Sequence, residues 1–339
     1  MRRFSFITIA LWLISATLPA QTHPMPVSAP EINDFSPTLN FLSSDWMEGR
    51  EPGPRGGYMA ADFIASMMQL NGLSPYGDID TLKSGQNSNA EAKTIFQQSY
   101  FQHFELKLYY VEKIGPWSLI LGRPGSVIVS NVTGIIRGQD STKSIVVGAH
   151  YDHLGIRNGL IYNGADDNAS GVSGMLALAK QWCEHGEKPA CNIIFAAWNC
   201  EERGMHGSRY FVRHTDANPG RVLAYINMDM ISRSAPEDTS RRQLSIGTMP
   251  QSEGLRQIAI EANLGLSQPF KLDLWDVTGH SGSDYASFTA ENIPVMTFFS
   301  GYQVDYHTPE DDAEKADLKK MEDILKLVNK CILEILEGL

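Results

Sequence analysis

Apolar runs that alternate with helical patterns constrain this chain more than any other feature of its sequence. Near-continuous apolar runs suit strands that are buried on both faces of a sheet. Such runs lie at residues 144–149, 192–198, 221–228 and 293–299. Apolar residues at helical spacing lie around and between them, at 62–73, 170–182, 205–213, 252–263 and 318–336. The alternation predicts an α/β fold, a three-layer α/β/α arrangement on a mixed but mostly parallel sheet.

The rest of the chain completes this expected domain. Residues 104–112 and 126–138 read as further strands, whereas the polar stretch 78–94 reads as a surface loop. The last helix has one apolar stripe of Leu318, Met321, Leu325, Val328, Ile332 and Ile335. No internal repeat or domain boundary is visible in the sequence, so residues 21–339 are expected to form a single domain.

Histidines and carboxylates follow the predicted strands at the points where these strands end. In open α/β sheets, ligands bind at the carboxyl ends of the strands. These ends supply His150 and Asp152, Glu201 and Glu202, Asp229, and His307 and Asp311, while the glycine-rich turn 163–171 adds Asp166 and Asp167. Each feature alone has a structural explanation, such as an N-cap or a charged turn. Their joint appearance at one sheet edge predicts a metal site there.

The residue types at this edge define the chemistry that they can support. Imidazole and carboxylate ligands without thiolate suit Zn, Mn or Co, with Zn the usual choice in a hydrolase. Two histidines and three carboxylates can hold two ions ~3.5–4 Å apart if one carboxylate bridges them. One acid is then left over as a general base. Because neighbouring side chains of an extended chain point to opposite faces, Glu201 and Glu202 are expected to serve different purposes.

Two residues near the first strand end are expected to lie outside the ligand set. Asp152 follows His150 by two residues and can accept the other ring N–H of that histidine. His153 is interpreted as a packing residue or an outer partner of the site. Two histidines three residues apart that leave a strand should diverge.

Five segments also resemble a known superfamily. GAHYDHLG, NGADDNASG, AAWNCEERGMHGS, INMDM and DYHTPEDD occur in the order and approximate spacing of the co-catalytic di-zinc aminopeptidases. That superfamily also contains glutamate carboxypeptidases and glutaminyl cyclases. Residues 45–75 are similar to its N-terminal segment, so the resemblance covers most of the chain. The protease-associated domain that the family often inserts has no room before residue 126.

The resemblance implies two Zn²⁺ ions per chain and assigns their ligands. His150 and Asp229 would bind one zinc, and Glu202 and His307 would bind the other. Asp167 would bridge the two ions.

The remaining roles also follow from the resemblance. Glu201 would be the general base that accepts a proton from metal-activated water and then protonates the leaving amine. Asp152 would orient His150, and Asp311 would support His307. Cys200 stands where many relatives have a small residue, a departure expected to affect only packing.

The expected function is that of an aminopeptidase acting on peptides with a free N-terminus, whose amino group the acidic site could bind. Three alternatives stay open: a glutaminyl cyclase, a carboxypeptidase, and a non-catalytic binding domain on the same fold. A carboxypeptidase would need a cationic pocket, for which the nearby candidates are Arg203, Arg209, Arg213 and Arg233. Side-chain preference is not specified, because Trp275, Phe298, Phe299 and Tyr302 could equally line a pocket or belong to the core.

Charge and the N-terminus bear on partners and location. The formal net charge of −11 argues against a nucleic-acid partner. Residues 1–20 combine a basic tip, an apolar stretch and Ala20, which is typical of a secretory signal peptide. The rival interpretation is a retained membrane anchor, but the apolar stretch is short of the ~20 residues that a span needs. We therefore expect an exported protein, periplasmic or secreted, without stable membrane insertion. The oligomeric state is left open.

The four cysteines are interpreted for an exported protein, which would fold in an oxidising compartment. In an oxidising environment Cys183 and Cys191 are expected to form a disulfide across the loop between a helix and a strand. Cys200 and Cys331 are expected to be free and buried.

Overall fold

The computed structural model describes residues 27–84, 93–114, 117–214, 220–279 and 281–338. The predicted signal peptide, residues 1–20, lies outside these ranges. The strands of the main sheet are β1 (Ser74–Pro75), β4 (Phe101–Ile114), β5 (Trp117–Ile136), β6 (Asp140–His150), β9 (Cys191–Trp198), β10 (Arg221–Met228), β11 (Gln243–Thr248), β12 (Lys271–Asp276) and β13 (Val295–Phe299). They form a nine-stranded sheet in the order β1-β5-β9-β6-β10-β13-β11-β12, with β4 paired to β5.

The centre of this sheet is parallel. Strands β9, β6, β10 and β13 pair in parallel, so their carboxyl ends meet at one edge. Antiparallel pairs flank them, with β5 beside β9 and β11 beside β13. The predicted α/β class with a mixed sheet is therefore confirmed.

Helices cover both faces of the sheet. They are α1 (Ile32–Leu42), α2 (Arg55–Leu70), α3 (Gly171–His185), α4 (His206–Arg213), α5 (Glu253–Leu264), α6 (Tyr285–Thr289) and α7 (Leu318–Glu337). Strand β9 shows why two layers form, because Ile193 and Phe195 join one apolar cluster while Ile194 and Ala196 join another. Helices α1, α2, α3, α5 and α7 pack on the first cluster, and α4 and α6 on the second. The apolar stripe predicted on the last helix packs into the first cluster.

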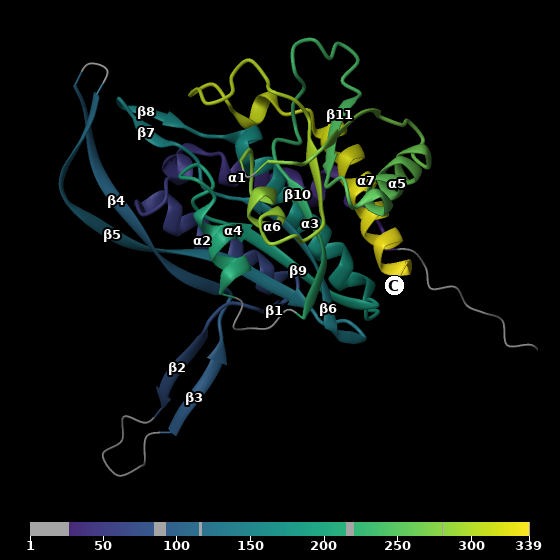
Figure 1. The fold of residues 1–339 in the computed structure, drawn as a ribbon, viewed down its shortest axis with the longest axis horizontal. Helices are drawn as coiled ribbons and strands as arrows, with labels where there is room; N and C mark the ends of the chain where they lie inside the picture. The colour runs from purple at the N-terminus through teal and green to yellow at the C-terminus, as the bar shows by residue number, and fades with distance from the viewer. Residues whose placement is uncertain (1–26, 85–92, 115–116, 215–219, 280, 339) are drawn as a thin grey trace, which may run out of the picture.

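One sequence expectation about local structure is wrong, and two strands were not predicted. The polar stretch 78–94 is not a loop throughout, because it includes β2 (Ile79–Ser84) and the first two residues of β3 (Lys93–Gln98), which form an antiparallel hairpin. This hairpin projects from the body, and the long hairpin of β4 and β5 extends in another direction (Figure 1). Its polar sequence is compatible with strands because the pair stands outside the main sheet. Strands β11 and β12 were not anticipated either.

The expected Cys183–Cys191 disulfide is not formed, and both residues are free thiols. Cys183 lies on α3 with its side chain directed at Gly72, whereas Cys191 is buried at the start of β9. Burial raises the pKa of each thiol to about 11. Cys200 and Cys331 are free and buried, as expected.

Within the described ranges, no helix combines the length and apolar character needed to cross a bilayer.

Candidate metal centre

The carboxyl edge of the parallel strands gathers the predicted site residues. His150 is the last residue of β6, Glu201 and Glu202 follow β9, Asp229 follows β10, and His307 lies in the segment after β13. Possible ligand atoms form two groups, each with all its atoms within 4.8 Å of one another: His150, Asp167 and Asp229; and His153, Asp167, Glu202 and His307. These groups therefore contain all five residues predicted as ligands. They also contain His153, which was not predicted as a ligand.

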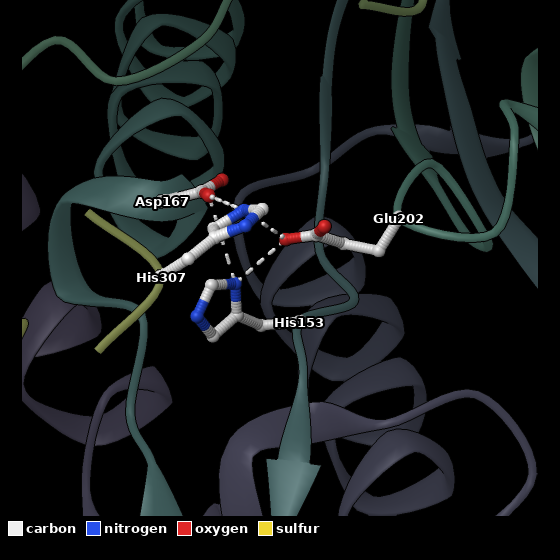
Figure 2. Close-up of side chains that lie close together, drawn as sticks. All are labelled: His153, Asp167, Glu202 and His307. Carbon is white, nitrogen blue, oxygen red and sulfur yellow. Dashed lines mark hydrogen bonds and ion pairs between the residues drawn. The ribbon is translucent and has the colours of Figure 1, made fainter. Parts of the chain in front are cut away.

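Asp167 belongs to both groups and presents one carboxylate oxygen to each. In the first group, Nε2 of His150 lies 3.3 Å from Oδ1 of Asp167 and 3.3 Å from Oδ1 of Asp229. In the second, Nε2 of His307 lies 3.0 Å from Oδ2 of Asp167 and 3.3 Å from Oε1 of Glu202 (Figure 2). This is the geometry that a bridging carboxylate requires.

His153 does not diverge from the site. Its Nδ1 lies 2.8 Å from Oε1 of Glu202 and 3.7 Å from Oδ2 of Asp167 (Figure 2). It uses the ring nitrogen nearer the main chain, whereas His150 uses Nε2, and so the two histidines reach different oxygens of Asp167. The expectation of divergence overlooked this choice of nitrogen.

Asp311 has a different role from the one expected. It is fully buried, and its carboxylate accepts the main-chain N–H groups of Asp166 and Asp167 at 3.0–3.2 Å. These bonds fix the turn that carries the Asp167 carboxylate. Asp311 thus supports Asp167 rather than His307.

Asp152 also acts through different atoms than expected. Nδ1 of His150 donates to the main-chain oxygen of Asp152 at 3.1 Å, while the carboxylate is 3.8 Å away. That carboxylate instead accepts the N–H groups of Glu201 at 3.0 Å and of Glu202 at 3.3 Å. It therefore positions the segment that carries both glutamates.

Arg50 is a buried cation behind the site that the sequence did not reveal. Its side chain is fully buried and donates to four main-chain oxygens, those of Leu42, Tyr151, Asn163 and Gly164, at 2.6–2.8 Å. Burial lowers its pKa to about 10. Arg50 thereby ties the segment after β6 to the turn before Asp167.

Electrostatics at this edge favour a bound cation. Burial raises the pKa of Glu201 to about 10 and that of Asp152 to about 7, with His150 opposing both shifts. Burial would also raise the pKa of Asp167, but hydrogen bonds from His150 and His307 outweigh it and hold that pKa low. The carboxylates of this region outnumber its histidines, so divalent cations would supply positive charge that the side chains lack.

Both groups open onto a cavity of about 360 Å³. Trp275, Phe299 and Tyr302 line its wall, whereas Phe298 is buried in the core. Of the four aromatic residues whose place the sequence left open, three therefore line the cavity and one belongs to the core. Glu201 also faces the cavity, although it belongs to neither donor group.

The cavity wall is acidic. Among the residues that the structure describes, no Lys or Arg lines it, while Asp273 and Glu201 do. The arginines considered as possible carboxylate anchors lie elsewhere: Arg203, Arg209, Arg213 and Arg233. Arg203 pairs with Glu51, and Arg233 pairs with Asp305 at 2.8 Å.

The arrangement of these groups agrees with the comparison to known proteins. Residues 131–332 match the model of Peptidase family M28. The chain belongs to this family. The superfamily resemblance inferred from the five motifs is thereby confirmed, and the M28 match includes every residue of both donor groups.

Individual M28-like proteins differ in their reactions. The probable glutamate carboxypeptidase LAMP1 of Arabidopsis thaliana is 27% identical over 254 residues, which cover 70% of this chain and 36% of that protein. The chain thus spans well under two thirds of this relative's length.

Two solved structures share the fold. The zinc aminopeptidase BSAP from Bacillus subtilis has a TM-score of 0.68 at 18% identity, covering 92% of this chain and 96% of that one. The glutaminyl cyclase of Porphyromonas gingivalis has a TM-score of 0.62 at 15% identity, covering 91% and 99%. At these identities the likeness is one of fold.

Proposed function

We propose that this M28 chain is an exported di-zinc exopeptidase, an aminopeptidase that releases N-terminal residues from peptides. The observation that carries the proposal is the position of Asp167. Its two carboxylate oxygens face separate donor groups beside one acidic cavity.

The donor set fits zinc. His150, Asp167 and Asp229 would hold one ion, while Asp167, Glu202 and His307 would hold the other. Imidazole and carboxylate atoms without thiolate are typical of hydrolytic zinc sites. Bound zinc would polarise the peptide carbonyl and lower the pKa of water at the site.

Glu201 would carry the proton in the reaction. Its carboxylate faces the cavity and belongs to neither donor group, so it is free to accept a proton and deliver it to the leaving amine. The main-chain N–H of Glu201 is held by Asp152, which keeps the glutamate next to the donor groups. Asp152 and Asp311 are thus positioning residues in this proposal.

The charge of the cavity favours a free amino terminus as the bound group. A substrate ammonium would meet carboxylates, whereas a substrate carboxylate would find no Lys or Arg on the described wall. This observation disfavours the carboxypeptidase alternative. The two donor groups disfavour a single-zinc glutaminyl cyclase, and the full set of donors with Glu201 disfavours a non-catalytic domain.

Metal analysis combined with a substrate panel tests the proposal. We expect two zinc ions per chain, hydrolysis of aminoacyl anilides, and no hydrolysis of the N-acetylated anilides. Cyclisation of N-terminal Gln peptides without anilide hydrolysis would instead identify a cyclase. Saturation of the active protein at one zinc would contradict the bridging role of Asp167.

Export and domain organisation are part of the same proposal. The basic and apolar residues before Ala20 support cleavage by a signal peptidase, and N-terminal sequencing of protein from the cell envelope or medium tests this. Strands β4 and β5 occupy residues 101–114 and 117–136, which supports a single catalytic domain, residues 21–339, without a protease-associated insert.

A further inference from the structure

We propose that His153 is a fourth protein ligand of the ion held by Asp167, Glu202 and His307, so that the two metal sites of this chain are unequal. The inference rests on the proposed di-metal centre and adds a ligand to it. It comes from the convergence of two imidazole nitrogens on the same two carboxylate oxygens (Figure 2).

The four atoms have the spacing of a single cation's ligand set. Nδ1 of His153 lies 2.8 Å from Oε1 of Glu202 and 3.7 Å from Oδ2 of Asp167. Nε2 of His307 lies 3.3 Å and 3.0 Å from the same two oxygens. Tetrahedral zinc with bonds of ~2.0–2.1 Å holds its ligand atoms ~3.3–3.4 Å apart. The observed distances lie on both sides of that value.

The orientation of His153 is set by its surroundings. Its main-chain N–H donates to the main-chain oxygen of Arg50 at 3.4 Å, and its residue is only 1% exposed. Its ring meets that of His307 edge-on, with centroids 5.7 Å apart. The two rings therefore approach the shared oxygens from different directions, as separate ligands of one ion would.

The alternative role for His153 is a hydrogen bond from Nδ1–H to Glu202 alone. Such a bond would occupy the ring nitrogen that lies closest to both carboxylates. The bond would account for the 2.8 Å contact with Glu202, but not for the approach of the same nitrogen to within 3.7 Å of Oδ2 of Asp167. Nε2 of His153 has no partner in the described structure under either role, so this atom does not favour one over the other.

The consequence is that the two ions would have different roles. Four protein ligands make a closed site of the structural type, whereas His150, Asp167 and Asp229 leave an open position of the type that catalytic zinc keeps. The closed site should fill first and bind more tightly. The open site should be the one that accepts water and substrate.

The direct test is paramagnetic proton NMR of the Co²⁺-loaded wild-type protein. Three strongly contact-shifted imidazole N–H signals are expected, one each from His150, His153 and His307. Two such signals in protein that holds two Co²⁺ ions would overturn the proposal. This measurement needs no variant and no enzymatic activity.

Zinc titration of His153→Ala gives a second test. Loss of an outer hydrogen-bond partner costs about 10–100-fold in metal affinity, so a lost ligand should cost more than about 100-fold at the tight site. His103→Ala, at an exposed histidine of β4, is the matched control and should bind zinc like the wild type. Two ions bound by His153→Ala at wild-type affinities would overturn the proposal.

The proposed function and this inference can fail separately. If wild-type protein binds two ions with three histidine signals but hydrolyses no anilide, the aminopeptidase proposal fails and the role of His153 stands. If wild-type protein hydrolyses anilides but shows only two histidine signals, the aminopeptidase proposal stands and the ligand role of His153 fails. Wild-type protein that binds no metal at all would overturn both.

Discussion

Oδ1 of Asp167 lies 3.3 Å from Nε2 of His150, while Oδ2 of the same carboxylate lies 3.0 Å from Nε2 of His307. One side chain thus belongs to both donor groups, whose other members come from several strand ends. Asp167→Asn should therefore weaken both zinc ions, because the neutral amide cannot bridge them with two anionic oxygens. Asp229→Asn, which touches one group, should weaken one ion only. Zinc content after gel filtration distinguishes them, and equal losses from the two variants would contradict the bridge.

Glu201 and Glu202 are adjacent, but their substitution should have different effects on zinc content and on kcat. Glu201→Gln keeps every donor atom, so two zinc ions should stay bound with KM nearly unchanged, while kcat falls about 10²–10⁴-fold because the proton acceptor is lost. Glu202→Gln should weaken one ion and recover part of its activity at high zinc. Zinc content and kcat should be measured for both. Loss of zinc in Glu201→Gln, together with two bound ions and a collapsed kcat in Glu202→Gln, would mean that the two roles must be exchanged.

Asp273 should direct the enzyme towards basic N-terminal side chains. It lines the cavity next to Ser245, whose hydroxyl donates to its carboxylate at 3.2 Å. A Lys or Arg substrate could lay its alkyl stem along Trp275 and Phe299 and direct its charge at Asp273. Asp273→Asn should lower kcat/KM for lysyl and arginyl anilides about fivefold, the effect of roughly 1 kcal/mol of charge interaction.

The leucyl anilide provides the internal comparison for this variant, since its rate should not change. Asp276→Asn is the matched control, because Asp276 lies on the same strand, pairs with Arg256 and does not line the cavity. An unchanged ratio of lysyl to leucyl activity in Asp273→Asn would remove Asp273 from substrate recognition.

Arg50→Lys should destabilise the protein despite keeping the charge. A lysine cannot reach the four main-chain oxygens that the guanidinium satisfies, and each buried acceptor left unpaired costs about 1–3 kcal/mol. We expect a loss of about 2–4 kcal/mol in the free energy of unfolding, measured in urea on zinc-loaded protein. Arg55→Lys should change it little, because Arg55 is exposed and contacts only side chains, Glu48 at 3.8 Å and Sδ of Met59 at 3.3 Å.

The sequence predicted the site residues that lie at the end of a strand or within a few residues after it. His150, Glu202 and Asp229 could be found because a parallel sheet brings its strand ends together, whatever the details of packing. The partners of Asp311 could not be found in this way. They depend on how a turn from one part of the chain docks against a loop from another, which no local pattern encodes.

Two other predictions, for His153 and for the cysteine pair, were wrong for local reasons. The position of His153 depended on which ring nitrogen faces the carboxylates, a rotamer choice that spacing along the chain does not determine. The cysteine pair was misjudged because closeness in sequence says nothing about side-chain direction. Cys183 and Cys191 lie on a helix and a strand that face different neighbours.

The hydrogen bonds that hold the site connect distant parts of the chain. Arg50 binds carbonyl groups 101 and 114 residues further along, and Asp311 holds the N–H of Asp167 across 144 residues. Contacts of such separation form slowly, since the intervening chain must first be ordered. A chain still emerging from the ribosome would lack Asp311, and with it the hydrogen bonds that fix the turn of Asp167. Tight zinc uptake should therefore be among the last events in maturation, and the metal content of a preparation would report the fraction of molecules that have folded completely.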